Sequence, residues 1–111
     1  MADVALITLS VARGSAKTYN GTHVTSGTDS TPVNITGWTI LVTARDENAR
    51  VVWQKTASVV SGAAGTYTWP LTASDTTISA KPYTEDIWRT DSGSETLMAL
   101  GTHTITSEVR V

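Results

Sequence analysis

The sequence predicts an all-β fold, an antiparallel β-sandwich of about seven strands. Apolar and polar residues alternate in several short segments, which is typical of strands that bury one face. Thr is the most frequent residue, and the abundance of Thr, Val, Ile and Trp favours strands over helices. Turn-forming residues separate these segments at intervals of about eight to twelve residues, as they do in sandwiches.

The first third of the chain is expected to contribute one full strand and one short strand. Val4–Val11 is predicted to be the first strand, and Arg13–Ser15 the break after it. Lys17–Asn20 is expected to pair briefly before a tight turn at Asn20-Gly21, because this dipeptide suits hairpin turns. Thr22–Pro32 consists mostly of Thr, Ser, Gly, Asp and Pro, so we predict a flexible loop near residues 22–32 and treat it as a candidate contact surface.

The clearest strand of the sequence is Gly37–Asp46, which alternates over its whole length. Asp46–Ala49 follows as a polar turn, and Val51–Ala57 is expected to return antiparallel as a hairpin. The face of Gly37–Asp46 that we predict to be buried carries Trp38, Ile40, Val42 and Ala44.

A flexible connector, Ser61–Gly65, precedes the next predicted strand, Thr66–Leu71. Pro70 falls on the outward face of that strand and indicates an edge position, where no hydrogen bond of a sheet is lost. Thr72 is predicted to cap a single helical turn that ends at Thr76, which is too short to be stable alone.

The last third of the chain is predicted to hold the remaining strands. Lys81–Thr90 is expected to be a strand and Asp91–Ser94 the turn after it. The turn leads into Glu95–Leu100, and Gly101 is expected to introduce a separate last strand, Thr102–Thr106.

Length and composition narrow the class of protein. At 111 residues the chain is expected to form one domain over residues 1–111. It has no Cys, so disulfides and thiolate metal sites are excluded. A net charge of −2 without a basic cluster argues against nucleic acid as a partner. We expect no signal peptide and no membrane partner, because the amino terminus lacks basic residues and no apolar run reaches the roughly 20 residues that span a bilayer.

Few residues could support catalysis or metal binding. The chain has two histidines, and their spacing does not match a zinc motif. His23 is expected to be a solvated residue of the Thr-rich loop, and His103 a hydrogen-bonded residue on the inward face of a strand. A nucleophile needs a positioned base, and no Gly-x-Ser-x-Gly or phosphate-binding loop is present. We therefore predict no enzymatic activity, no catalytic residue, no cofactor and no metal.

The acidic and aromatic residues suggest where a partner could bind. Glu85 and Asp86 must point to opposite faces of a strand, and both are expected to be solvated or paired with Arg89 or Lys55. Trp38 and Trp69 are in phase with apolar neighbours and are predicted to be core residues. Trp53 and Trp88 are less constrained, and an exposed Trp could stack on a sugar or on a partner's side chain. The candidate interaction residues are Trp53, Trp88, Asp86 and His23.

Several segments resemble, in order, the motifs of small tailed-phage proteins. An Arg-Gly entry at Arg13-Gly14 precedes them, and together they cover about two-thirds of the chain, Ile35 to Val111. His103 stands where the family usually has an aromatic or aliphatic residue. The chain resembles the immunoglobulin-like domain at the amino end of baseplate upper proteins, and standalone virion proteins of similar length. The matching segments are Pro32–Ile40 (PVNITGWTI), Gly65–Thr72 (GTYTWPLT), Tyr83–Asp91 (YTEDIWRTD) and Leu100–Thr106 (LGTHTIT).

The resemblance implies an immunoglobulin-like β-sandwich that serves as a bacteriophage virion structural protein. We expect a tail or baseplate adaptor, made in the host cytoplasm, that docks other phage virion proteins and copies of itself as a homo-oligomer in the assembled particle. A capsid cement or decoration protein that braces the shell is an alternative of the same class. A carbohydrate-binding module that uses Trp53 or Trp88 with Asp86 is an alternative of a different class.

Overall fold

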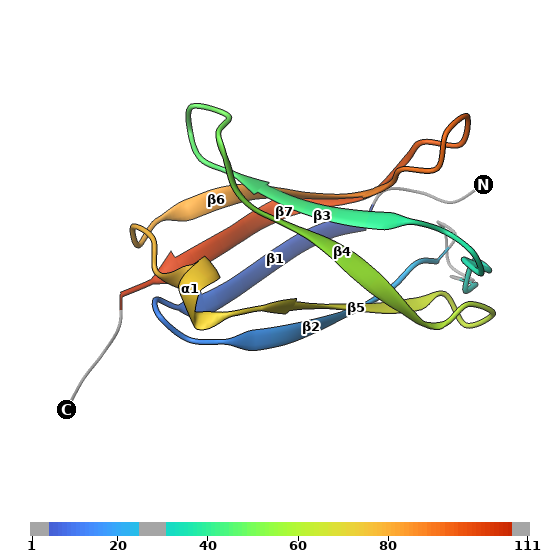
Figure 1. Ribbon diagram of the computed structural model, residues 1–111, viewed down its shortest axis with the longest axis horizontal. Coiled ribbons are helices and arrows are strands. Elements are labelled where there is room, and N and C mark those ends of the chain that lie inside the picture. The colour runs from blue at the N-terminus through green and yellow to red at the C-terminus, as the bar shows by residue number, and fades with distance from the viewer. Residues whose placement is uncertain (1–4, 25–30, 108–111) are drawn as a thin grey trace.

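The structure is a computed structural model, and it describes residues 5–24 and 31–107. These residues form an all-β fold of seven strands and one short helix, so the predicted fold class is confirmed at this level (Figure 1). No helix among them is long and apolar enough to cross a membrane. The elements are β1 (Ala5–Ala12), β2 (Lys17–Thr22), β3 (Ile40–Arg45), β4 (Val51–Ser61), β5 (Thr66–Leu71), α1 (Ala73–Thr76), β6 (Pro82–Arg89) and β7 (Thr96–Thr106).

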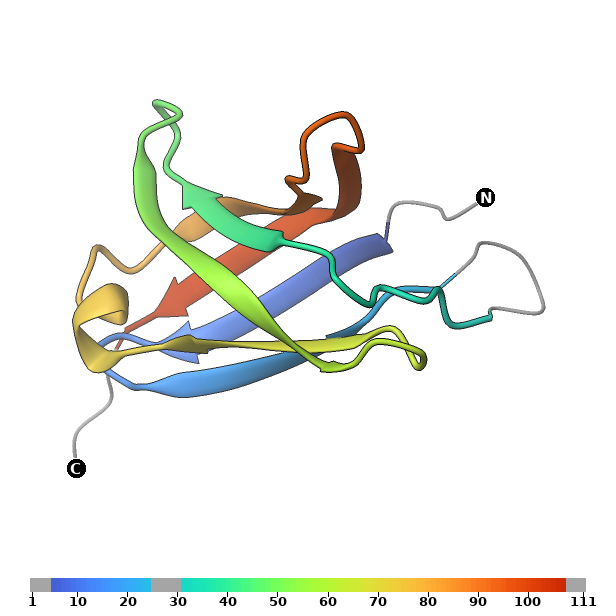
Figure 2. The ribbon, with the colours of Figure 1, turned by 45° about the vertical axis from the view of Figure 1, so that its right-hand side comes forward.

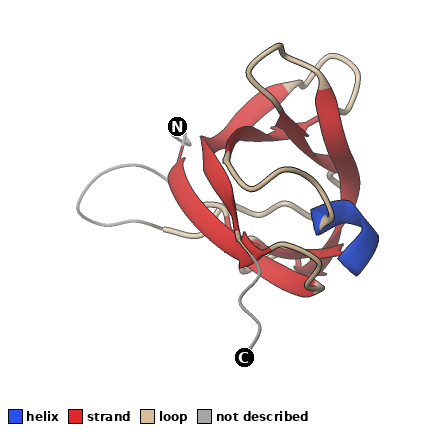
Figure 3. Cartoon of the chain, turned by 90° about the vertical axis from the view of Figure 1, so that its left-hand side faces the viewer, coloured by secondary structure: helices blue, strands red, loops and turns tan. Residues whose placement is uncertain are grey.

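The strands form one sheet in the order β1-β7-β6-β3-β4-β5-β2, which curls until it is nearly a barrel (Figure 3). β1 runs parallel to β7, whereas the other neighbours are antiparallel, so the prediction of a purely antiparallel sheet is wrong at this end. β4 pairs with β3 through Val51–Ala57 and with β5 from Ser58 to Ser61. This strand therefore passes from one side of the curled sheet to the other (Figure 2).

The alternation that marks β3 in the sequence describes its packing. Ile40, Val42 and Ala44 have no exposed surface, and they lie between β4 and β6. Thr43 on the opposite face is also buried, and its hydroxyl accepts a hydrogen bond from the side-chain amide of Gln54 on β4. The polar turn after β3 and the antiparallel return of β4 agree with the prediction.

Two glycines that were predicted to mark breaks between strands lie inside strands instead. At each of them a neighbouring element comes too close to leave room for a side chain. Asn20 and Gly21 belong to β2 and pair with β5, so the tight turn predicted there is wrong. A Cβ atom on Gly21 would collide with the ring of Tyr67. Gly101 lies within the single strand β7 rather than before a separate one, and a Cβ atom there would collide with the carbonyl oxygen of Ile7 on β1.

The region around β5 and α1 agrees with the sequence in part. β5 lies between β4 and β2, so it is not an edge strand, but its pairing with β4 ends at Thr68 and does not reach Pro70. Thr72 caps α1 as predicted, and its hydroxyl oxygen accepts a hydrogen bond from the backbone N–H of Asp75. Lys55 forms an ion pair with Asp75 at 2.7 Å, and not with the acidic residues of β6.

The predicted loop at residues 22–32 lies partly outside the described residues, which resume at residue 31. At its described ends Val24 forms an antiparallel bridge with Pro32. The backbone N–H of His23 donates to the carbonyl oxygen of Gly65, so this part of the chain continues along β5.

Candidate functional site

The most unusual feature of the interior is a polar network that joins four strands. Glu85 of β6 and His103 of β7 have no exposed surface, and His103 Nδ1 lies 3.0 Å from Glu85 Oε2. The other ring nitrogen of His103 lies 2.9 Å from the hydroxyl oxygen of Tyr19 on β2. Trp53 of β4 donates its indole N–H to Glu85 Oε1 at 3.3 Å. Every polar side-chain atom of Glu85 and His103 therefore has a partner.

The strand period explains why an acidic residue lies in the core. Tyr83, Glu85 and Ile87 occupy one face of β6, and all three are buried. The prediction that Glu85 is solvated is wrong, because Glu85 lies on the same face of β6 as its buried apolar neighbours. The network gives both of its buried oxygens a hydrogen-bond partner. The prediction for His103, a hydrogen-bonded core residue on an inward face, is confirmed.

The proton positions in the network are limited by the single hydrogen of the Tyr19 hydroxyl. That hydroxyl lies within reach of both the carbonyl oxygen of Ser10, at 3.1 Å, and His103 Nε2. If Tyr19 donates to Ser10, Nε2 carries a hydrogen and donates to the Tyr19 oxygen, and Nδ1 either donates to Glu85 or accepts from it. If Tyr19 donates to Nε2, the ring is neutral and Nδ1–H donates to Glu85. In each arrangement Glu85 Oε1 accepts from Trp53.

The order carboxylate, imidazole, hydroxyl is the same as in catalytic triads, but its environment differs. Aromatic rings close around His103, with the Tyr19 and Trp53 ring centroids each 5.0 Å away. Burial and the nearby Glu85 carboxylate raise the pKa of Tyr19 to about 12, so the hydroxyl stays protonated at neutral pH. A nucleophile must reach its substrate, and this hydroxyl lies in a closed interior. The network therefore connects four strands in the interior.

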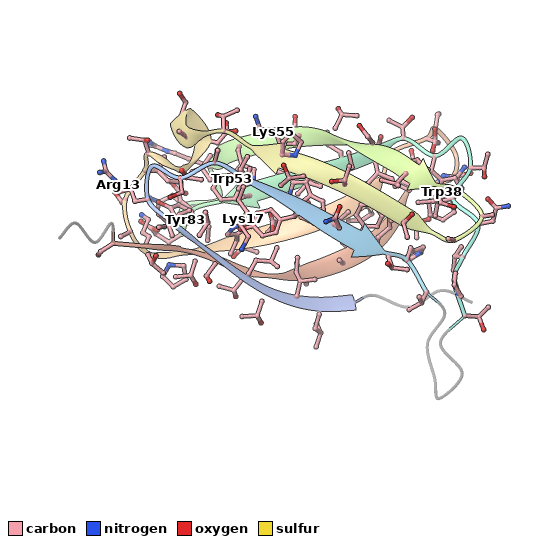
Figure 4. All side chains as sticks on the ribbon, turned by 90° about the horizontal axis from the view of Figure 1, so that it is seen from below. Arg13, Lys17, Trp38, Trp53, Lys55 and Tyr83 are labelled. Carbon is pink, nitrogen blue, oxygen red and sulfur yellow. The ribbon has the colours of Figure 1, made fainter. Side chains whose placement is uncertain are left out.

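His23 also differs from its sequence prediction. It was expected to be a solvated loop residue, but it is only 4% exposed, and its ring packs 5.6 Å from that of Trp38. Its Nε2 atom has no hydrogen-bond partner, and burial lowers the pKa of the ring, which favours the neutral form. The Arg89 guanidinium lies 4.4 Å from the centroid of the Trp38 ring, and Arg89 also pairs with Asp91. His23 and Trp38 are thus packing residues at one end of the molecule, where Figure 4 shows Trp38.

Of the other three candidate residues, Trp53 lies in the interior, and Trp88 and Asp86 lie on the outer surface. Trp53 is buried among side chains between the two sides of the sheet (Figure 4) and cannot contact a partner there. Trp88 is 38% exposed on the outer face of β6. Asp86 shares that outer face and forms a 2.6 Å ion pair with Arg45 of β3. Of the four candidate interaction residues, only Trp88 and Asp86 lie together on the outside.

The sequence reasoning missed other apolar residues on the outer face that carries Trp88. Leu6 of β1 is 88% exposed and pairs in register with the exposed Leu100 of β7. Trp88 lies beside Leu41 of β3 and Leu97 of β7 in the same way. The run Ala5–Leu9 could have indicated an exposed apolar side chain, because it places apolar residues on both faces of β1. We call this set the outer apolar patch: Leu6, Leu41, Trp88, Leu97 and Leu100.

No model of a known protein family matches the chain, and no curated protein is significantly similar to it in sequence. Within residues 5–24 and 31–107, no group of three His, Asp or Glu side chains is placed to hold a metal ion. Among the described residues, the outer apolar patch and the edges of β1 and β2 are exposed.

Proposed function

We propose that the chain is a non-enzymatic structural protein of a tailed-phage virion, a tail or baseplate adaptor that docks neighbouring virion proteins and copies of itself. The observation that carries the proposal is the ordered resemblance of the motifs from Ile35 to Val111 to those of small phage virion proteins. The chemistry of the interior supports it, because the Glu85–His103–Tyr19 network is closed and the exposed features are suited to binding rather than to a reaction.

We also propose that the curled sheet is a variant of the immunoglobulin-like sandwich that the resemblance implies. In this description one layer holds β1, β7, β6, β3 and the first part of β4, and the second holds the end of β4, β5 and β2. The switch of β4 from β3 to β5 at Ala57–Ser58 supports the division, because sandwich strands can change sheets at such points. β1 and β7, the first and last strands, then lie side by side (Figure 1).

Docking in this proposal uses the outside of a rigid body. β1 and β2 are the two ends of the sheet, and an edge strand can accept a strand from a neighbour. The outer apolar patch lies on the layer in which β1 is the edge strand. Contacts that are weak singly become strong when they repeat in a closed assembly, because linked sites bind at high effective concentration.

The test is to locate the protein. We expect its gene in a phage or prophage genome, and mass spectrometry of particles purified from that phage should find the protein in many copies. A gene outside any phage genome, or particles that lack the protein, would overturn the proposal. A reconstruction of the particle would separate the tail position from the alternative, a capsid decoration protein, since the chain would then lie on the shell.

A carbohydrate-binding module is the second candidate, and one observation favours it. Trp88 is exposed two residues from Asp86 on the same face, so a sugar ring could stack on the indole while the carboxylate accepts a hydroxyl hydrogen bond. Glycan-array binding that Trp88→Ala abolishes without loss of fold would support this candidate. The same experiment with Trp53→Phe is a control, because Trp53 is buried and its change should leave glycan binding intact.

A further inference from the structure

β1 ends the sheet, and the direction of its backbone groups can be read residue by residue. The carbonyl oxygen of Ile7 points at Gly101 of β7, and the carbonyl oxygen of Val11 accepts from the Thr106 hydroxyl on the same strand. The carbonyl oxygen of Ser10 points the other way, because it accepts from Tyr19 on β2. Since backbone groups alternate along a strand, those of Leu6 and Thr8 also point away from β7. Their N–H and C=O groups have no partner strand among the described residues.

Within residues 5–24 and 31–107, this edge carries none of the usual protection. Natural proteins block exposed strand edges with Lys, Pro, a bulge or a covering segment. β1 (ALITLSVA) has no charged residue and no Pro, its pairing with β7 shows no bulge, and its residues favour strands. β1 and β2 separate as they leave the turn that joins them (Figures 1 and 4), so β2 does not cover the beginning of β1.

The edge of β2 is different and serves as an internal comparison. Lys17 lies at its start, with the ammonium 5.1 Å from the Tyr19 ring centroid, and Gly21 weakens the strand near its end. The β2 edge is therefore protected by a charged residue, whereas the β1 edge has no charged residue and carries apolar side chains.

We propose that β1 pairs antiparallel with β1 of a second copy of this chain, about a two-fold axis that passes beside Ile7. In this register Leu6 of each copy lies opposite Thr8 of the other, and each pair exchanges both of its backbone hydrogen bonds. These are the backbone groups that face away from β7. The partner is a second copy because the same short edge is complementary to itself under a two-fold axis, the commonest symmetry of oligomers. This inference rests on the proposed function, in which copies of the chain contact one another, and it names the contact.

The side chains agree with this register. Leu6 and Thr8 are exposed on the outer face, where an aliphatic and a β-branched side chain form a favourable cross-strand pair. Ile7 is half-buried against the core, and at the axis it would meet Ile7 of the second copy. Pairing would join two curved sheets into one and bring the outer apolar patches of both copies onto a continuous face.

The proposed contact between the two β1 strands is small, so the dimer should be weak. A single pair of strands buries less than the roughly 1,200–2,000 Å² of a stable interface. We therefore expect a reversible dimer whose fraction rises with protein concentration.

The test uses a substitution that acts only on the outward face of the backbone. Thr8→Pro removes an N–H that points away from β7, and Pro is tolerated at such edge positions. Thr8→Val keeps the N–H and is the matched control. In sedimentation equilibrium over a concentration series, wild type and Thr8→Val should dimerise alike, whereas Thr8→Pro should associate at least about tenfold more weakly. Circular dichroism and thermal unfolding should show that all three proteins fold.

Amide hydrogen exchange identifies the edge. With rising concentration the amides of Leu6 and Thr8 should become more protected, while those of Ile7 and Leu9, which face β7, stay protected throughout. Protection that rises instead at Thr18 and Asn20 would place the contact at β2 and overturn the inference. A wild-type protein that remains a monomer over the whole series, or a Thr8→Pro variant that dimerises like wild type, would also overturn it. None of these results removes the protein from a virion, so the proposed function is tested separately.

Discussion

His103 Nδ1 lies 3.0 Å from Oε2 of Glu85, and both side chains are completely enclosed. These two residues lie on adjacent strands, and through Tyr19 and Trp53 they connect β6 and β7 with β2 and β4. β2 is at one end of the sheet, far from β7 in strand order. The network therefore links β7 to β2 and β6 to β4, two pairs of strands that share no backbone pairing, and it acts as a polar brace across the curled sheet.

Removal of one member of this pair should destabilise the fold strongly. Glu85→Leu leaves the N–H groups of His103 and Trp53 without an acceptor in the interior, and we expect a loss of about 3–5 kcal/mol in the free energy of unfolding. His103→Leu should have a similar effect. The double variant should lose less than the sum of the two, because both unpaired groups are removed together. Urea unfolding followed by Trp fluorescence measures all three.

Thr84→Ala is the control for the Glu85 series, since Thr84 is the exposed neighbour on β6 and its change should stay within about 0.5 kcal/mol. If Glu85→Leu is as stable as Thr84→Ala, then the enclosed contact between Glu85 and His103 does not brace the sheet.

Stability at alkaline pH should depend on the buried tyrosines. Burial, with a further effect of Glu85, raises the pKa of both Tyr19 and Tyr67 from 10.0 to about 12. The folded state therefore keeps these protons where the unfolded chain loses them, and the free energy of unfolding should fall as the pH rises from about 10 to about 12. Unfolding in urea across this range, with phenolate absorbance of the native protein, measures the effect.

Tyr19→Phe provides the comparison for that pH series. It removes one of the three buried phenols whose pKa is raised, so the decline between pH 10 and 12 should become shallower, although the variant is less stable at pH 7 because it loses the hydroxyl's hydrogen bonds. An unchanged slope would mean that the Tyr19 proton is not held more tightly in the folded state.

The regular elements could be predicted because their signals are local. The alternation in β3, the turn after it and the capping of α1 by Thr72 each depend on residues that are close in sequence. The parallel pairing of β1 with β7 joins the two ends of the chain, and no local pattern specifies it. At Asn20-Gly21 the local signal is strong but misleading: this dipeptide favours a turn, yet it lies in a strand because it pairs with β5.

The candidate site was predicted less well than the fold, and Glu85 shows why. Charge suggested a solvated position, but Glu85 is in phase with Tyr83 and Ile87, and the phase decides which face is buried. The residues that make its burial possible, His103 and Tyr19, are distant in sequence and come together only in the folded chain. His23 was misplaced for a similar reason, because it follows β2 along β5 rather than entering a loop.

Acid should destabilise the protein through His23. Burial lowers the pKa of His23 below 6.5, so between the lowered value and 6.5 the unfolded chain binds a proton that the folded state does not. The free energy of unfolding should therefore fall as the pH decreases below about 6.5. His23→Asn should reduce this dependence. Since the chain has two histidines, NMR titration of wild type and variant assigns the His23 signal directly. A His23 signal that titrates at or above 6.5 would contradict the prediction.

Gly101, the single glycine of β7, should be sensitive to substitution. A Cβ atom there would collide with the carbonyl oxygen of Ile7, a backbone atom that cannot rotate away, so β1 would have to move. We expect Gly101→Ala to cost about 1–3 kcal/mol in urea unfolding. Amide exchange should become faster first at Ile7 and Leu9, whose N–H groups face β7. Thr102→Ala, at the exposed next position, should change neither quantity. If Gly101→Ala unfolds at the wild-type urea concentration, β1 does not approach β7 as closely as the parallel register requires.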